Sequence, residues 1–219
     1  MVLYITAKMK IIDFETYSEK LKIKPMSLKD LDKIGNIEYK YWPKYKKELK
    51  KTVLNLINEY GPNCDLNCID TSNITDMSLL FDECKEFNCD ISKWNVSNVK
   101  DFYCMFYGCH SFNCDISRWN VSSAENMNGM FYNCHEFNQN LNKWDVSNVK
   151  NMASMFARCA KFNNPLDKWN IKSLERMDYM FNQAISFNQD ISGWDTSNVN
   201  SAVEVFDHCY IKKEYKPKI

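Results

Sequence analysis

The chain contains only five glycines and five prolines among its 219 residues. Glycine is the residue that most readily adopts a left-handed backbone conformation, so a fold with many tight turns needs another residue in that role. Asparagine tolerates this conformation and recurs at regular positions along the chain, which makes it the expected substitute.

Net charge and long apolar runs are also lacking. Lysine and arginine together number 28, and so do aspartate and glutamate, which argues against a dedicated binder of nucleic acid or membrane surfaces. No stretch approaches the roughly 18 uncharged apolar residues of a membrane span. The chain opens with an apolar run too short for a signal peptide, and no basic segment precedes it. We therefore expect a cytoplasmic protein; a secreted chain whose leader had been trimmed would look the same.

A period of 25 residues organises most of the sequence. One column of this repeat holds tryptophan, and two further columns hold phenylalanine, without insertion or deletion. The tryptophans are Trp94, Trp119, Trp144, Trp169 and Trp194. A strict short period is typical of supersecondary units that stack into a solenoid.

Each repeat has two halves with different periodicity. Met127, Met130, Phe131 and Cys134 are spaced i, i+3, i+4, i+7, which predicts a short helix of two to three turns. The other half of the repeat, for example residues 137–144, alternates apolar and polar residues, which predicts a short strand. We therefore expect strand–helix repeats whose strands stack into a parallel sheet.

The period divides the chain into three parts. Residues 1–61 precede it and are predicted to form an N-terminal cap, because the open end of a solenoid exposes apolar side chains. The cap is expected to hold a short helix over 27–35 and an amphipathic helix over 44–60. Residues 62–210 form about six repeats, and residues 211–219 form a polar C-terminal tail.

Three columns are expected to have structural roles. An indole suits an interior that gives its N–H group one partner, so the tryptophans are predicted to be core. A cysteine column that includes Ala184 is predicted to hold small, reduced, buried side chains. A column of asparagines is expected to satisfy backbone groups of the turns and to pass hydrogen bonds between repeats. These are Asn88, Asn113, Asn138, Asn163 and Asn188.

The repeat resembles that of the BspA-like leucine-rich-repeat family, also called the mycoplasma lipoprotein repeat domain. Residues 187–199 read FNQDISGWDTSNV, a very close match to its pattern, and the resemblance covers roughly residues 44–210. It implies an α/β fold, a right-handed leucine-rich-repeat-like solenoid. Many members are surface proteins implicated in adhesion, so it also implies a non-enzymatic interaction module.

The methionine and cysteine columns could hold a reactive site or form part of the core. Methionine and cysteine are soft ligands suited to Cu(I), but their spacing is more typical of a core. Nucleophilic catalysis by cysteine needs a partly exposed thiol and a nearby base, and the least explained thiol is that of Cys104. We predict no catalytic residue, no metal ligand and no cofactor.

The variable columns are the expected site of function. A basic row lies beside the tryptophans, and several tyrosines occupy positions that the core spacing does not require. Clustered exposed tyrosines suggest contact with a partner. The candidate residues are Tyr103, Tyr107, Tyr132, Tyr179, Lys93, Arg118, Lys143 and Lys168. The leading hypothesis is a monomeric or weakly oligomeric scaffold that binds a protein partner; the alternatives are self-assembly and, third, a cysteine enzyme or soft-metal protein.

Overall fold

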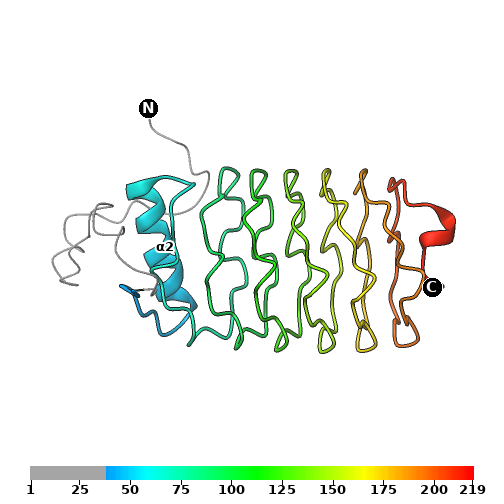
Figure 1. The fold of residues 1–219 in the computed structure, drawn as a ribbon, viewed down its shortest axis with the longest axis horizontal. Coiled ribbons are helices and arrows are strands. Elements are labelled where there is room, and N and C mark those ends of the chain that lie inside the picture. The colour runs from blue at the N-terminus through cyan, green and yellow to red at the C-terminus, as the bar shows by residue number, and fades with distance from the viewer. Residues whose placement is uncertain (1–37) are drawn as a thin grey trace. The chain divides into compact units, whose positions relative to one another are not determined.

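The computed structural model describes residues 38–219. This part of the chain contains one α-helix, α2 (Lys46–Tyr60), and one 3-10 helix, η2 (Lys213–Tyr215). Residues Tyr39–Ile219 form one compact unit, in which the remaining backbone runs as similar loops stacked side by side (Figure 1). The short helix expected over 27–35 lies outside the described residues.

The 25-residue period is the spacing of this stack. Isolated parallel bridges join residues 25 positions apart in neighbouring repeats. One column of bridges runs through Asp76, Asp101, Asn126, Asn151, Arg176 and Ser201. We count the first repeat as residues 63–87 and the sixth as residues 188–212. Equivalent side chains therefore lie over one another from repeat to repeat.

Helix α2 forms close to where its amphipathic pattern predicts. It begins at Lys46 and gives way to Gly61, whose φ of 91° is accessible mainly to glycine. Leu49, Val53 and Leu56 are buried on its inner face. Tyr45 lies within the range predicted for this helix, but it precedes the helix as its N-cap residue and is 55% exposed.

The short helix expected in each repeat is not formed. Residues 127–134 are a series of turns, in which Gly129 and Asn133 have φ values of 63° and 62°. A right-handed helix cannot continue through left-handed residues. Instead, alternate N–H groups bond to the next repeat, from Met127 to Asn151 at 2.9 Å and from Phe131 to Met155 at 3.0 Å. The helical spacing therefore identified the buried side chains but predicted the wrong backbone.

The expected strands also differ from what the structure shows. The described residues contain isolated bridges and no strand or sheet. Around residue 138, side chains make some of the hydrogen bonds that join neighbouring repeats. The N–H group of Asn138 donates to Oδ1 of Asn113 at 2.9 Å, and that of Asn163 donates to Oδ1 of Asn138 at 3.0 Å. Asparagine amides thus replace the carbonyl partners that a parallel strand would supply.

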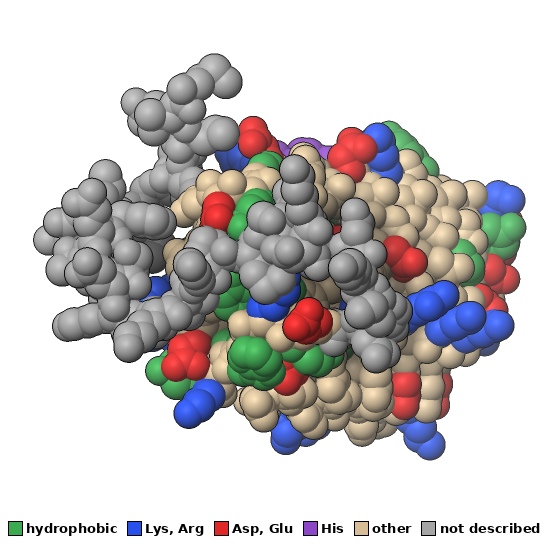
Figure 2. Space-filling model, turned by 60° about the vertical axis from the view of Figure 1, so that its left-hand side comes forward, with side chains coloured by type: hydrophobic (Ala, Val, Ile, Leu, Met, Phe, Trp, Pro, Cys, Tyr) green, Lys and Arg blue, Asp and Glu red, His purple; other side chains and the backbone are tan. Residues whose placement is uncertain are grey.

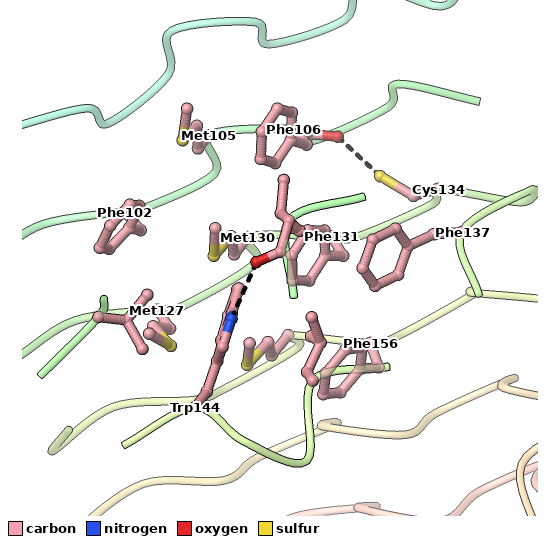
Figure 3. Packing of buried hydrophobic residues seen from close by; sticks show 14 of the residues in the cluster. Phe102, Met105, Phe106, Met127, Met130, Phe131, Cys134, Phe137, Trp144 and Phe156 are labelled. Atoms are coloured by element: carbon pink, nitrogen blue, oxygen red, sulfur yellow. Dashed lines mark hydrogen bonds between the residues drawn. The ribbon is translucent and has the colours of Figure 1, made fainter. Parts of the chain in front are cut away.

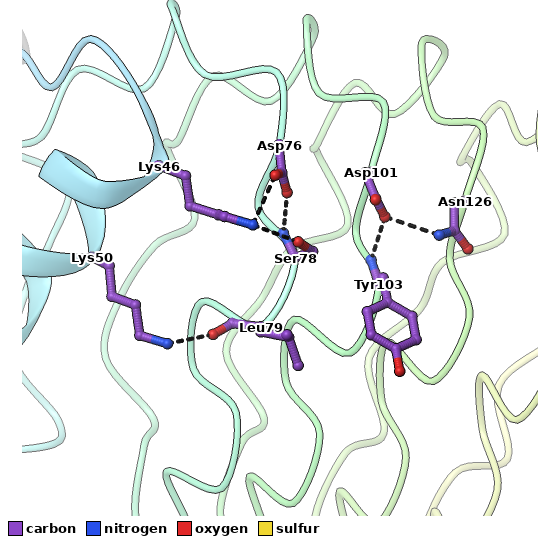
Figure 4. Close-up of polar contacts among 8 residues, drawn as sticks. All are labelled: Lys46, Lys50, Asp76, Ser78, Leu79, Asp101, Tyr103 and Asn126. Atoms are coloured by element: carbon purple, nitrogen blue, oxygen red, sulfur yellow. Dashed lines mark hydrogen bonds and ion pairs between the residues drawn. The ribbon is translucent and has the colours of Figure 1, made fainter. Parts of the chain in front are cut away.

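Aspartate and asparagine make most corners of the repeat. A side-chain oxygen at one residue accepts the N–H group two residues later, which is an Asx-turn. In the second repeat, Asp90 accepts from Ser92 at 2.9 Å, and Asp101 accepts from Tyr103 at 2.8 Å (Figure 4). In each repeat, two further residues have a left-handed backbone conformation, and most of them are not glycine. They include Leu79, Glu83, Cys104, Ser154, Arg158, Tyr179 and Gln183. This arrangement is how a chain with few glycines turns so often.

Replacing Ser154 with glycine is expected to stabilise the fold. Its φ of 56° costs a residue with a Cβ atom about 1–2 kcal/mol, of which the greater freedom of glycine in the unfolded chain offsets about 0.5–1 kcal/mol. Valine at the same position is expected to destabilise the fold by about 1 kcal/mol or more, because a β-branched side chain tolerates this conformation least. Urea unfolding measures both changes. Ser173→Gly is the matched control, since Ser173 is exposed and has no positive φ, and it should give no gain. Equal changes in the free energy of unfolding at the two serines would contradict the conclusion that the backbone at Ser154 is strained.

The core consists of aromatic columns that run through the stack. Phe131 is fully buried, and its ring stacks on Phe137 within the repeat, with centroids 4.1 Å apart (Figure 3). It also stacks on Phe106 and Phe156 of the neighbouring repeats, at 5.7 Å each. Each repeat thus buries its large side chains against both neighbours.

Helix α2 packs on the first repeat. The Lys46 ammonium group lies 2.7 Å from the Asp76 carboxylate and donates to the Ser78 hydroxyl at 2.6 Å (Figure 4). The Lys50 ammonium group donates to the Leu79 carbonyl at 2.7 Å. Residues 76–79 of the first repeat are therefore covered by a helix and not by another repeat.

The C-terminal residues 211–219 are not a free tail. Ile211 is buried, and the N–H group of Lys212 donates to Oδ1 of Asn188 at 2.9 Å. The N–H group of Ile191 donates to the Tyr215 carbonyl at 3.0 Å, and the Lys216 ammonium group lies 5.2 Å from the centre of the Phe206 ring. These contacts cover part of the last repeat.

Candidate functional site

The tryptophan column lies in the interior. The five indoles are 3–6% exposed. Each N–H group donates to the backbone carbonyl of the residue 28 positions earlier, as Trp144 does to Ile116 at 3.1 Å (Figure 3). The same bond occurs in Trp94, Trp119, Trp169 and Trp194, at 3.0, 3.1, 2.9 and 3.0 Å. These side chains offer no binding strip to a ligand in solvent.

The main cysteine column is equally buried. Cys109, Cys134 and Cys159 have no exposed surface, and each thiol donates to a phenylalanine carbonyl at 2.9–3.0 Å. Burial raises the pKa of all three thiols. The neutral thiol is therefore the stable form in this column.

Cys104 is 8% exposed and sits at a left-handed position. Burial raises the pKa of its thiol, and the carboxylates of Asp82 and Asp101 act in the same direction. A catalytic cysteine needs the opposite shift. Among residues 38–219, no group of three or more His, Cys, Asp or Glu side chains is placed to hold a metal ion, and no helix is long and apolar enough to cross a membrane.

The asparagine column forms a continuous ladder on the surface. Each side-chain oxygen accepts the backbone N–H group of the next asparagine, at 2.9–3.0 Å from Asn88 through Asn188. Gln139 and Gln189 donate to the same ladder from the adjacent column. The ladder uses these amides within the stack, so its role in the structure is to join repeats.

The basic row is exposed along its length. In the described part of the chain, Lys93, Arg118, Lys143 and Lys168 form no ion pair within 4 Å. Beyond them, Gly193 has no side chain, and an open hollow of about 490 Å³ lies there between Pro165, Asp167, Gln189 and Trp194. The charges of both signs are interspersed on the face that Figure 2 shows, without a large field of one sign.

Two of the candidate tyrosines are brought together. The rings of Tyr107 and Tyr132 stack in parallel, with centroids 4.6 Å apart and planes inclined by 4°. The Arg158 guanidinium group lies 5.7 Å from the centre of the Tyr132 ring, a cation–π arrangement. Tyr103 and Tyr179 are each 40% exposed but belong to other columns of the repeat. Tyr103 lies in the second repeat with Tyr107, and Tyr179 lies in the fifth.

Two histidines form a second stack, and the sequence analysis did not include them among the candidate residues. The His110 and His135 rings lie 4.5 Å apart, and the Asn133 amide contacts one ring on each side, at 3.1 and 2.7 Å. Burial lowers the pKa of His110, and His135 and Lys85 lower it further. We call Tyr107, His110, Tyr132, His135 and Arg158 the aromatic patch. Their 25-residue spacing was a usable signal, since Tyr107 and His110 recur as Tyr132 and His135.

Comparison with known protein families matches residues 51–157 and 139–214 to the family described as "Mycoplasma protein of unknown function, DUF285". Neither the curated proteins nor the solved structures give a match. The two matched stretches overlap and together cover more than half of the chain. The chain therefore belongs to this family of mycoplasma proteins of unknown function.

Proposed function

We propose that this protein is a non-enzymatic scaffold, a right-handed BspA-like leucine-rich-repeat solenoid, that binds a protein partner through its variable surface columns. The observation that carries the proposal is the aromatic patch. The column of Tyr107 and Tyr132 holds Ala157 and Asp207 in later repeats, so the packing of the repeat does not require an aromatic ring there.

The chemistry of the patch suits a protein interface. Tyrosine and arginine are enriched among residues that contribute most to binding, and rings that are already stacked lose little conformational entropy on contact. The lowered pKa of His110 favours its neutral form near pH 7, which makes desolvation of this part of the patch less costly. Tyr103, 40% exposed and four residues before Tyr107 in the same repeat, is included in the candidate surface.

Replacing Tyr103, Tyr107 and Tyr132 together with serine is expected to abolish partner capture. The three rings are at most partly buried, so the melting temperature should change by only a few degrees. Affinity capture from native lysate, followed by identification of the partner and titration with the purified proteins, measures the loss. Tyr45→Ser with Tyr210→Ser is the matched control, since those rings are 55% and 77% exposed and lie outside the patch. Unchanged affinity in the triple variant would refute this surface.

A charge-reversal variant of the basic row tests the second candidate surface. Lys93, Arg118, Lys143 and Lys168 are changed to glutamate in the otherwise unaltered protein. If only this variant loses the partner, the binding face is the basic row and not the patch. Residual binding that falls with salt in both variants would place the partner across both surfaces.

Self-assembly is the second candidate function, and the C-terminal end of the stack favours it. In inner repeats alternate N–H groups bond to the following repeat. The equivalent groups of Ala202, Glu204 and Phe206 have no partner among the described residues. Such an edge can accept an extended strand from another chain. Analytical ultracentrifugation at micromolar protein concentration tests this function. An apparent molecular mass that rises with protein concentration supports self-assembly, and a monomer excludes it.

A further inference from the structure

A second cysteine column contains a close pair of thiols. The Sγ atoms of Cys64 and Cys89 lie 3.2 Å apart, in the first and second repeats, and both thiols are free. The backbone holds them in register. The N–H group of Asp90 donates to the Cys64 carbonyl at 2.9 Å, and a parallel bridge joins Asp65 to Asp90.

The spacing of the backbone fits a disulfide. Hydrogen-bonded extended chains lie about 4.8 Å apart, and disulfide-bonded residues have Cα atoms about 4.4–6.8 Å apart. Cys114 occupies the same column one repeat further on, but its sulfur accepts the N–H group of Ile91 at 3.5 Å and lies 3.9 Å from Asp90. The contact between sulfurs is thus specific to Cys64 and Cys89.

The two thiols differ in access. Cys64 is partly exposed, whereas Cys89 has no exposed surface and its sulfur lies 3.1 Å from the Pro62 carbonyl. The hydrogen bond from Cys89 lowers the pKa of Cys64 and raises that of Cys89. This geometry suits one attacking thiol and one resolving thiol.

We propose that Cys64 and Cys89 are a redox pair that forms an intramolecular disulfide by exchange with a small-molecule disulfide. The Cys64 thiolate attacks one sulfur of the reagent, the reagent's S–S bond breaks, and one small thiolate leaves and takes up a proton. Cys89 then loses its proton to solvent and attacks the Cys64 sulfur, which releases the second small thiolate. Two protein thiols are oxidised, and one small disulfide is reduced to two thiols.

The bond joins the first repeat to the second beside the end that α2 covers. It closes a loop of 25 residues and restricts the unfolded chain. The melting temperature of the oxidised protein should therefore rise by roughly 5–10 °C. Oxidation would stabilise the N-terminal end of the stack, because that end has a repeat on only one side.

Incubation of the folded chain with oxidised glutathione tests the proposal. The wild type should release two glutathione molecules per chain and show a Cys64–Cys89 cross-link on non-reducing peptide mapping. Cys89→Ser should stop at a mixed disulfide on Cys64, and Cys64→Ser should leave Cys89 unmodified. Cys114→Ser, in the same column, should behave as the wild type. The cross-link in the wild type is measured without any variant, so the test does not depend on how the variants fold.

Three results would overturn the proposal. They are a wild type that accumulates the mixed disulfide, a cross-link that joins Cys64 to Cys68 or Cys114, and a wild type whose thiols remain unmodified. None of these outcomes bears on the aromatic patch, which lies in other columns of the repeat.

Discussion

Replacing Phe131 with alanine should destabilise the protein by about 3–5 kcal/mol, a large part of the total stability of an ordinary domain. The ring is fully buried in the third repeat and touches aromatic rings on three sides: Phe106, Phe137 and Phe156. Its removal leaves a cavity that the neighbouring rings cannot fill without leaving their own stacks. Urea unfolding followed by tryptophan fluorescence measures the loss.

Phe206→Ala is the matched control for this change. Phe206 occupies the same column in the last repeat, is only partly buried and stacks on one repeat neighbour, Phe181, at 5.7 Å. The same substitution there should cost about 1–2 kcal/mol, because part of the ring is already in solvent. In a stack held together by contacts between neighbours, inner positions have two interfaces to lose and end positions have one. Equal losses at the two positions would show that the stack is not the source of the stability.

Changes at Trp144 separate the contribution of the ring from that of its N–H group. Trp144→Ala should cost about 3–5 kcal/mol through the lost burial, since the indole is 3% exposed. Trp144→Phe keeps most of the ring and removes the 3.1 Å bond to the Ile116 carbonyl, which still accepts the Trp119 N–H group at 3.1 Å. The loss of this one hydrogen bond should cost about 0.5–1.5 kcal/mol. Both values come from urea unfolding midpoints.

The expected order, alanine worse than phenylalanine and phenylalanine worse than wild type, depends on a buried indole. A phenylalanine variant as stable as the wild type would mean that the indole N–H group adds nothing to the stability beyond the bond that the Trp119 N–H group makes to the same carbonyl. Tryptophan to phenylalanine at Trp194 provides the comparison at the end of the stack, where the indole is 6% exposed and still donates to Leu166 at 3.0 Å.

Much of the interior could be predicted from the sequence, because a fixed period places equivalent residues over one another whatever the backbone does. The positions of the indoles and the phenylalanines in the stack follow from that rule alone. Helix α2 was also predictable, since its apolar stripe is continuous from Leu49 to Leu56 and Gly61 follows it.

The backbone of the repeats was not predictable in this way. The spacing of Met127, Met130, Phe131 and Cys134 fits a helix, and it also fits turns that place the same side chains inward. The two differ in where the N–H groups bond: within the segment in a helix, or to the next repeat in this structure. A single repeat does not contain the second set of acceptors.

For the candidate sites, too, the sequence determined one part and the tertiary structure another. The sequence alone determined the period, the columns and which of them vary. Only the tertiary structure decided that Tyr107 lies on Tyr132, that His110 stacks on His135, and that Cys64 meets Cys89. The physical reason is that each of these contacts joins different repeats, and its geometry depends on how the repeats are stacked and on backbone angles that the residue pattern does not specify.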